Sequence, residues 1–301
     1  MGTWGISLYS GDFAADLRGT VRAVIRLPFE PDRLAEIVID AEHGAARNPE
    51  DEDHTTFWLV LADQFARQGI RSEQVIETAL QIIDSGTDLD MQARLGQAAA
   101  GLEKRRRVLV ELRERIVSPP VAGTRKVLRR PQAFVMDVGD ALIYPTCFGQ
   151  CRNPYAVRLD RLKIYGPKGG EIWTPGGWGA IVIVERGLTF GFFAWYRAIV
   201  LRREWSSAPD LAGLRDEEWR LESPGTCSPT HFRRMGFEKV GTFDIDGGRL
   251  RERYGPLRPG DPQAIGDISI ANRLHVVASG STRPMATTQP KHLVRIADLA
   301  P

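Results

Sequence analysis

The chain has 301 residues, of which 43% are hydrophobic and 26% charged, with a formal net charge of +2 at pH 7. No apolar run approaches the ~18 residues that a membrane-spanning helix needs, and the first residues lack the pattern of a secretory signal. Three cysteines are too few for a disulfide framework in a chain of this length. We therefore expect a cytoplasmic globular protein with no membrane partner.

The charge is unevenly divided along the chain. Residues 1–118 carry a net charge of −6 and residues 119–301 a net charge of +8. A chain of this length has room for two domains, and the change of sign supports that division. The basic second part would suit an acidic partner such as nucleic acid, although a solvated surface of mixed charge is the simpler explanation.

The first part shows helical periodicity. Capping residues or a first-position proline precede apolar positions at helical spacing, which predicts five helices, over residues 13–26, 31–43, 50–69, 72–86 and 102–116. The third is apolar almost all round, which is typical of a helix at the centre of a bundle. We predict a helical domain over residues 1–117 and a linker over 118–124, where SPPVAG stops the last helix.

Periodicity changes after the linker. Short β-branched or aromatic runs alternate with turn signals: FVMDVGDALIY, GAIVIVERG, LTFGFFAWY and RAIVLR, with a hairpin turn expected in VERGLTF. DEEWRL and SPTHFRRMG suggest short helical pieces, and GDISIANRLHVVASG a further strand. The predicted fold class is α+β, a helical bundle followed by a small, strongly curved antiparallel sheet or barrel-like domain over 125–278. Residues 279–301 are expected to be a mostly flexible tail.

Both parts resemble bacterial proteins. MGTWGISLYSGDFAADLR, FWLVLADQFARQG, ALQIIDSG and EKRRRVLVELRERI, in this order, resemble a family of small helical proteins that begin MGTWG and are classed as a domain of unknown function. That resemblance covers about the first 117 residues and implies a fold but no activity. VGDALIYP, at residues 138–145, resembles the start of the barrel in β-rich immunity proteins of bacterial toxin systems, although CFGQCRNPY is inserted where those barrels turn quickly.

The three cysteines and one histidine form two spaced pairs. Cys147 and Cys151 make C-x-x-x-C, and Cys227 and His231 make C-x-x-x-H. Two such pairs on separate loops are the ligand set of a tetrahedral structural zinc site, with no position open for water. Buried thiols without a metal, or a redox pair of Cys147 and Cys151, are alternative interpretations of the same residues.

Asp63 and two charged runs are further candidates. Asp63 follows Leu59 and Val60 on the most apolar helix, so if it is buried it must be hydrogen-bonded; a role as a catalytic acid is the alternative. The acidic run over residues 51–53 favours a helix start rather than a metal site, because adjacent residues on a helix point in different directions. The basic run over residues 104–107 is typical of a solvated helix face.

The second part is enriched in tryptophan. Trp173 and Trp178 lie in the glycine-rich segment GGEIWTPGGWG, and together with Arg202 and Arg203 they are candidate anchors for a protein partner. Packing of these tryptophans against the barrel is the alternative, and the more common role of such residues. The sequence thus predicts a non-catalytic protein-binding module. The resemblance implies an immunity or antitoxin-like protein whose partner is a toxin or another bacterial protein. The alternatives are a zinc-stabilised nucleic-acid-binding or regulatory protein, and an enzyme of unrecognised class. For an enzyme, the sequence shows no recognisable combination of a nucleophile, a general base and a residue that orients the base.

Overall fold

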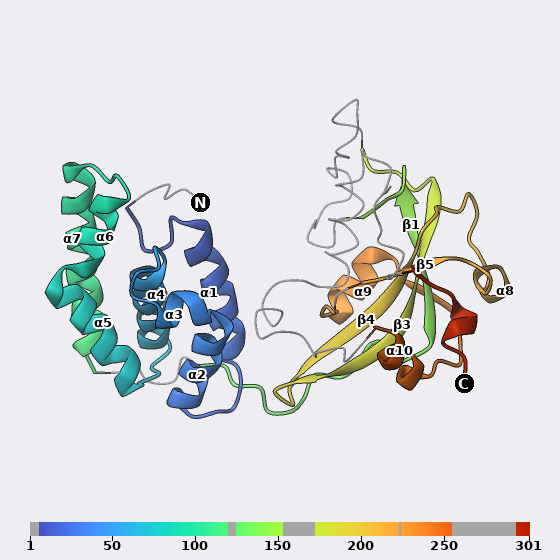
Figure 1. Ribbon diagram of the computed structural model, residues 1–301, viewed down its shortest axis with the longest axis horizontal. Helices are drawn as coiled ribbons and strands as arrows, with labels where there is room; N and C mark the ends of the chain where they lie inside the picture. The colour runs from blue at the N-terminus through green and yellow to red at the C-terminus, as the bar shows by residue number, and fades with distance from the viewer. Residues whose placement is uncertain (1–5, 120–124, 153–171, 223, 255–292) are drawn as a thin grey trace. The chain divides into compact units, whose positions relative to one another are not determined.

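The computed structural model describes residues 6–119, 125–152, 172–222, 224–254 and 293–301. The chain forms two compact units, one ending at Arg130 and the other beginning at Pro131 (Figure 1). Helices make up the first and an antiparallel sheet dominates the second, so the predicted α+β class is confirmed. Of the helices that the structure describes, none is long and apolar enough to cross a membrane.

The first unit is a helical bundle built around one central helix. Its helices are α1 (Asp12–Val24), α2 (Pro31–Ala41), α3 (His43–Arg47), α4 (His54–Arg67), α5 (Glu73–Ser85), α6 (Thr87–Arg94) and α7 (Ala99–Val117). Helix α4 contacts α1, α3, α5, α6 and α7, and every residue from Phe57 to Phe65 is buried (Figure 1). The prediction of a central helix is therefore confirmed, and its all-round apolar surface is explained by neighbours on every side.

Two short helices and one helix start differ from the predictions. Helices α3 and α6 were not expected, because five and eight residues are too few to display a repeating apolar pattern. Gly86, in the left-handed conformation with φ 77°, ends α5 and leads directly into α6. Helix α4 begins at His54, so the preceding acidic residues form a turn in front of the helix rather than its first turn.

The division between the units falls later than the predicted linker. The Arg125 guanidinium donates hydrogen bonds to the backbone carbonyls of Ile25, Leu27 and Phe29, and the Leu128 amide donates to the Arg26 carbonyl. These carbonyls follow the end of α1, where backbone acceptors lack partners within the helix. The described residues from Arg125 to Arg130 therefore belong to the helical unit.

The second unit contains one antiparallel sheet. Its strands are β1 (Asp140–Cys147), β2 (Gln150–Cys151), β3 (Gly177–Thr189), β4 (Phe193–Leu201), β5 (Trp219–Leu221), β6 (Glu238–Thr242) and β7 (Leu293–Val294). The order is β2-β1-β3-β4-β5-β7, with β6 also paired to β1. Helices α8 (Leu211–Leu214), α9 (Pro229–Met235) and α10 (Gly247–Tyr254) accompany it. The sheet is open among the described strands, so the closed-barrel form of the prediction is not what the structure has.

Both faces of the sheet are buried. Leu142 and Tyr144 belong to one apolar cluster with Cys151, whereas Ala141 and Ile143 belong to a second cluster on the other face. Side chains alternate between faces along a strand, so the continuous apolar run AIVIV supplies both clusters at once. A run that is apolar at every position is typical of a strand buried on two sides, and all five residues of this run are buried.

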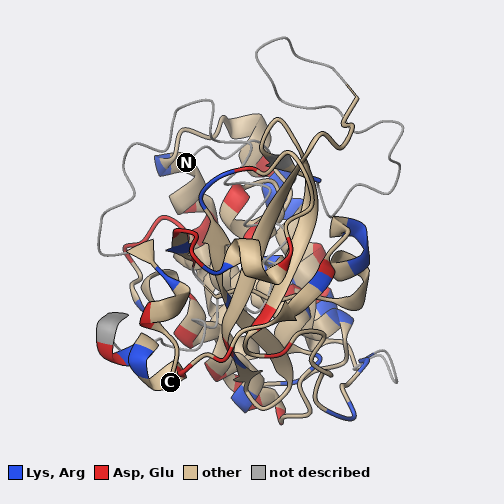
Figure 2. Ribbon diagram, turned by 90° about the vertical axis from the view of Figure 1, so that its right-hand side faces the viewer, with Lys and Arg blue, Asp and Glu red and all other residues tan. Residues whose placement is uncertain are grey.

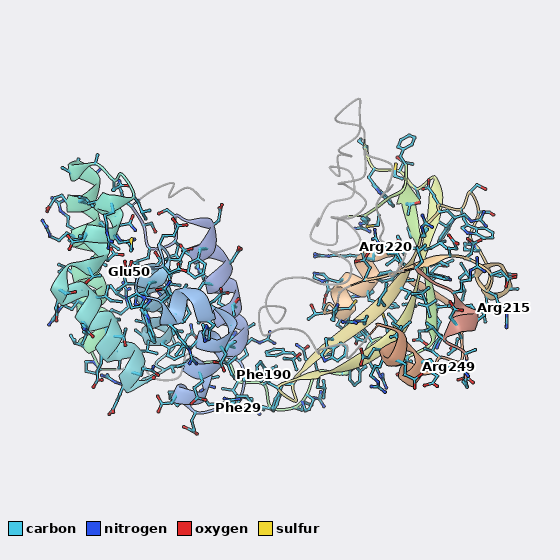
Figure 3. All side chains as sticks on the ribbon, viewed as in Figure 1. Phe29, Glu50, Phe190, Arg215, Arg220 and Arg249 are labelled. Carbon is cyan, nitrogen blue, oxygen red and sulfur yellow. The ribbon has the colours of Figure 1, made fainter. Side chains whose placement is uncertain are left out.

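Three local predictions in this unit need correction. The β3–β4 turn begins at Phe190, the last residue of VERGLTF, and continues through Gly191, both with positive φ; the six residues before Phe190 continue β3 instead (Figure 3). Within DEEWRL the last three residues form β5 rather than a helix, because they pair with β4 and β7. The end of the chain is packed, since Val294 and Leu299 are buried. SPTHFRRMG forms α9 as predicted, and GDISIANRLHVVASG lies outside the described residues.

Candidate functional site

The predicted zinc site is not assembled. Strands β1 and β2 form a tight hairpin in which Cys147 pairs with Gln150 and Thr146 with Cys151. Because paired residues share a face and neighbours along a strand alternate, Cys147 and Cys151 point to opposite faces of the sheet. Throughout the described residues, which include His231 and all three cysteines, no three His, Cys, Asp or Glu side chains are arranged to hold a metal ion.

The cysteines are free thiols in buried surroundings. Cys151 and Cys227 belong to the same apolar cluster, and burial raises the pKa of each to about 12. A thiol with such a pKa is almost entirely protonated at neutral pH and is a poor nucleophile. Burial, followed by the nearby charge of Arg234, also lowers the pKa of His231 on α9. This geometry matches the alternative of buried thiols and does not match a redox pair of Cys147 with Cys151.

Asp63 is buried, as expected, and its carboxylate is saturated with donors. It accepts hydrogen bonds from Arg67 Nε at 2.7 Å, from the Arg115 guanidinium and from the Tyr9 hydroxyl. Burial, and then Asp63 itself, raises the pKa of Tyr9 to about 12. These hydrogen bonds to Asp63 join α4, α7 and the segment before α1.

A second buried ion pair was missed by the sequence analysis. Arg105, in the basic run of α7, is 5% exposed and pairs with Asp88 of α6, with Nε–Oδ2 at 2.8 Å and Nη2–Oδ1 at 3.0 Å. Thr55 Oγ1 donates to the same carboxylate at 3.1 Å. The other basic residues of this run that pair with Glu103 are exposed. Because α6 was not predicted, no partner was visible for a buried arginine.

Trp205 connects two of the predicted anchors, Trp178 and Arg203, and both tryptophans are partly buried and pack against the apolar cluster on one face of the sheet. Trp178 and Trp205 form an antiparallel bridge, with N–O distances of 2.8 and 2.9 Å, and both side chains are half-buried. The Arg203 guanidinium lies 4.7 Å from the Trp205 ring centre, a cation–π arrangement. We call Trp178, Trp205 and Arg203 the Trp–Arg surface. The sequence analysis selected two of its members but missed Trp205, whose pairing depends on strand register.

The other two predicted anchors have different environments. Arg202 is exposed and pairs with Glu218, with Nη1–Oε2 at 2.7 Å, while Arg203 also binds Glu217. Trp173 is half-buried in the segment before β3. Basic and acidic positions are interspersed along the ribbon (Figure 2), and these glutamates neutralise the two arginines locally. The arrangement suits recognition of shape and hydrogen bonds better than attraction of a polyanion.

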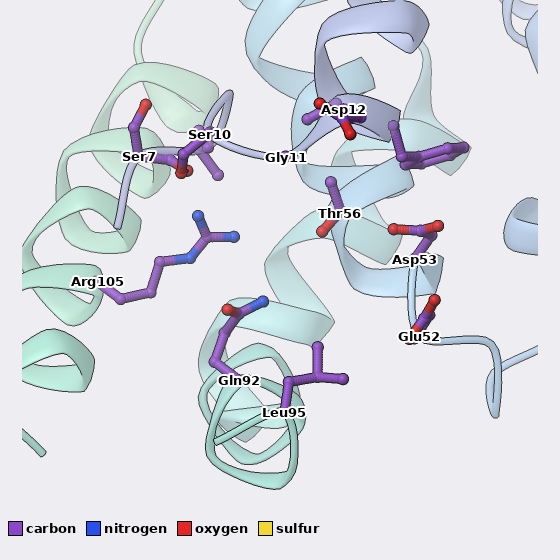
Figure 4. Close-up of a pocket in the computed structure, with 13 residues that line it drawn as sticks. Ser7, Ser10, Gly11, Asp12, Glu52, Asp53, Thr56, Gln92, Leu95 and Arg105 are labelled. Atoms are coloured by element: carbon purple, nitrogen blue, oxygen red, sulfur yellow. The ribbon is translucent and has the colours of Figure 1, made fainter. Parts of the chain in front are cut away.

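The helical unit contains a polar pocket of about 320 Å³ (Figure 4). It lies between the segment that enters α1, the acidic turn before α4, the end of α6 and Arg105 of α7. Its lining combines hydroxyl, amide and carboxylate groups with a few apolar side chains: Ser7, Leu8, Ser10, Gly11, Asp12, Phe13, Ala14, Glu52, Asp53, Thr56, Gln92, Leu95 and Arg105. No local pattern indicates this pocket, because its walls come from four separate segments.

Comparison with known proteins adds no further information on function. No protein-family model matches the chain, and no match was found among curated proteins or solved structures. The resemblances to the MGTWG family and to immunity proteins therefore stay predictions.

Proposed function

We propose that this chain is a non-catalytic protein-binding module that engages its partner through the Trp–Arg surface. The observation that carries the proposal is the stacking of Arg203 on Trp205 beside Trp178. Tryptophan and arginine are the residues most enriched among those that dominate the binding energy of protein interfaces. Stacking also pre-orders the arginine, so that less side-chain entropy is lost when a partner binds.

The partner that we would test first is a bacterial toxin. The resemblance of residues 138–145 to immunity proteins motivates this choice, and β1, which contains most of these residues, lies next to β3, which contains Trp178. In such a role the module would cover the active site of the toxin. Binding would then require shape complementarity, with the paired charges of Arg202 and Arg203 setting the orientation.

The decisive experiment measures binding with a purified partner. The full chain is isolated from its host with any bound protein, the complex is reconstituted from pure components, and Kd is measured by calorimetry. Arg203→Glu should weaken binding at least tenfold, because it reverses the charge stacked on Trp205. Arg249→Glu, on α10 of the same unit (Figure 3), is the matched control and should change Kd less than twofold.

A second variant distinguishes the loss of a binding contact from a folding defect. Trp205→Phe keeps an aromatic ring beneath Arg203 but reduces the stacking area, so it should weaken binding less than Arg203→Glu. Equal affinity for Arg203→Glu and the unmodified chain would refute the proposed surface. Salt-sensitive retention on DNA without any protein partner would instead favour the nucleic-acid alternative.

A further inference from the structure

The polar pocket of the helical unit is large enough for a ligand. Its volume of about 320 Å³ falls at the lower end of the range typical of small-molecule sites, roughly 300–1,000 Å³. Figure 4 shows Gln92 and Arg105 on one side of the space and Asp53 on the other, with Thr56 between them. All the described lining residues belong to the helical unit, and none comes from the sheet unit.

Gln92 provides the first sign that the pocket holds a ligand. It lies on α6, is only 6% exposed and directs its side chain into the pocket (Figure 4). Within the described chain its side-chain amide makes no hydrogen bond. The amide atoms of Gln92 are not among the fully buried unpaired atoms, so they reach solvent through the pocket, where a ligand can replace water as their hydrogen-bond partner. The amide therefore marks a hydrogen-bonding position inside the pocket.

Asp53 provides the second sign. It occupies the N-cap position of α4, where an aspartate normally accepts a hydrogen bond from the first turn, yet its side chain makes no capping bond. The carboxylate faces the pocket instead (Figure 4). Partial burial, followed by the charges of Glu52 and Asp51, raises the pKa of Asp53.

The charges of the lining residues determine whether the pocket favours a positively or a negatively charged ligand. Among the described residues that line the pocket, Asp12, Glu52 and Asp53 contribute three carboxylates and Arg105 is the only basic residue. The guanidinium of Arg105 is already paired through two hydrogen bonds to Asp88. The start of α1 would by itself attract an anion, but Asp12 in its first turn compensates that dipole. The net field in the pocket thus favours a positive charge.

We propose that this pocket binds a small organic cation, with its ammonium or guanidinium group next to Asp53 and donating a hydrogen bond to the Gln92 side-chain oxygen. Apolar walls from Leu8, Phe13 and Leu95 would contact the attached carbon chain. An organic cation fits better than a metal ion, because the described residues provide no set of three metal-binding side chains.

Calorimetric titration of the full chain tests this proposal. The probes are n-butylguanidinium and n-butylammonium, with n-butylurea as a neutral comparator of similar shape. We expect saturable binding of at least one cation and binding of the urea at least tenfold weaker. A peptide, acetyl-Gly-Arg-Gly-amide, distinguishes a free small cation from the side chain of another protein: equal affinity for the peptide indicates the latter.

Matched variants locate the binding. Asp53→Asn should weaken cation binding at least tenfold, and Gln92→Leu should weaken it severalfold, without lowering the melting temperature, since neither side chain stabilises the fold by a hydrogen bond. Glu50→Gln removes a nearby acid that does not line the pocket (Figure 3) and should leave binding within twofold. Saturable binding of neither cation, equal binding of the urea, or an unchanged affinity in Asp53→Asn would overturn the proposal.

Discussion

In the helical unit the buried carboxylates of Asp63 and Asp88 are held by arginines, whereas in the sheet unit three tryptophan N–H groups lie buried without a hydrogen-bond partner in the described structure. Long, flexible side chains on neighbouring helices can reach one another from several alternative positions, so a buried charge on a helix can find a partner. Strand positions are fixed by pairing, and a large ring is placed where the register puts it. The two buried carboxylates of the helical unit thus have guanidinium partners, whereas the indole N–H groups of these three tryptophans of the sheet unit have none.

The largest expected effect comes from breaking the buried pair of the helical unit. Asp88→Ala leaves Arg105 buried without its partner, which should lower the free energy of unfolding by about 3–5 kcal/mol. Denaturant titration measures this loss, and hydrogen exchange should place it in α6 and α7. As a control, Asp84→Ala removes an exposed pair with Arg113 and should have a far smaller effect. Equal effects of the two variants would contradict the comparison.

A smaller effect is expected where the sheet unit does use a polar contact. The Val135 amide donates to the hydroxyl of fully buried Tyr196 at 2.8 Å. Tyr196→Phe removes the acceptor and leaves the amide unpaired, which should cost about 1–3 kcal/mol. Increased hydrogen exchange should be confined to residues near Val135 and β4. Exchange that rises equally in the helical unit would show that the units do not respond separately.

The smallest effect concerns the cysteines. Because the pKa values of Cys151 and Cys227 are about 12, only about 10⁻⁴ of each thiol is ionised at pH 8. Iodoacetamide should therefore modify these thiols only after denaturation, and a strong chelator should leave the melting temperature unchanged. Mass spectrometry of labelled peptides and a thermal melt check both points. Rapid native labelling, or a lower melting temperature with chelator, would restore the metal or redox interpretation.

Much of the helical unit was predictable because its signals are local. Capping residues and apolar spacing identified its longer helices, and the apolar neighbours of Asp63 indicated its burial. The residues that saturate Asp63 come from α7 and from the segment before α1, so their identity depends on packing that periodicity does not encode. Arg105 was assigned to a solvated face for the same reason, because its partner lies on the unpredicted helix α6.

In the sheet unit the strands were predictable but their register was not. The apolar runs predicted β1, β3 and β4, yet a two-residue hairpin loop separates Cys147 and Cys151 onto opposite faces. A spacing pattern alone does not distinguish such a hairpin from a metal-binding loop. Trp205 was missed as a binding residue because its neighbour Trp178 comes from the start of a distant strand. The polar pocket, assembled from four segments, lay beyond any local signal.

Strand β6 completes one side of β1 only late in synthesis. It pairs with Asp140–Ile143, and the Phe243 amide donates to the Gly139 carbonyl at 2.9 Å. Strand β1 ends at Cys147 and β6 begins at Glu238, so all of the intervening chain must leave the ribosome before the two strands can pair. Until then, part of β1 presents unsatisfied backbone groups that another nascent chain could pair with. Truncated products ending before Glu238 should accordingly aggregate, while the helical unit made first stays in solution.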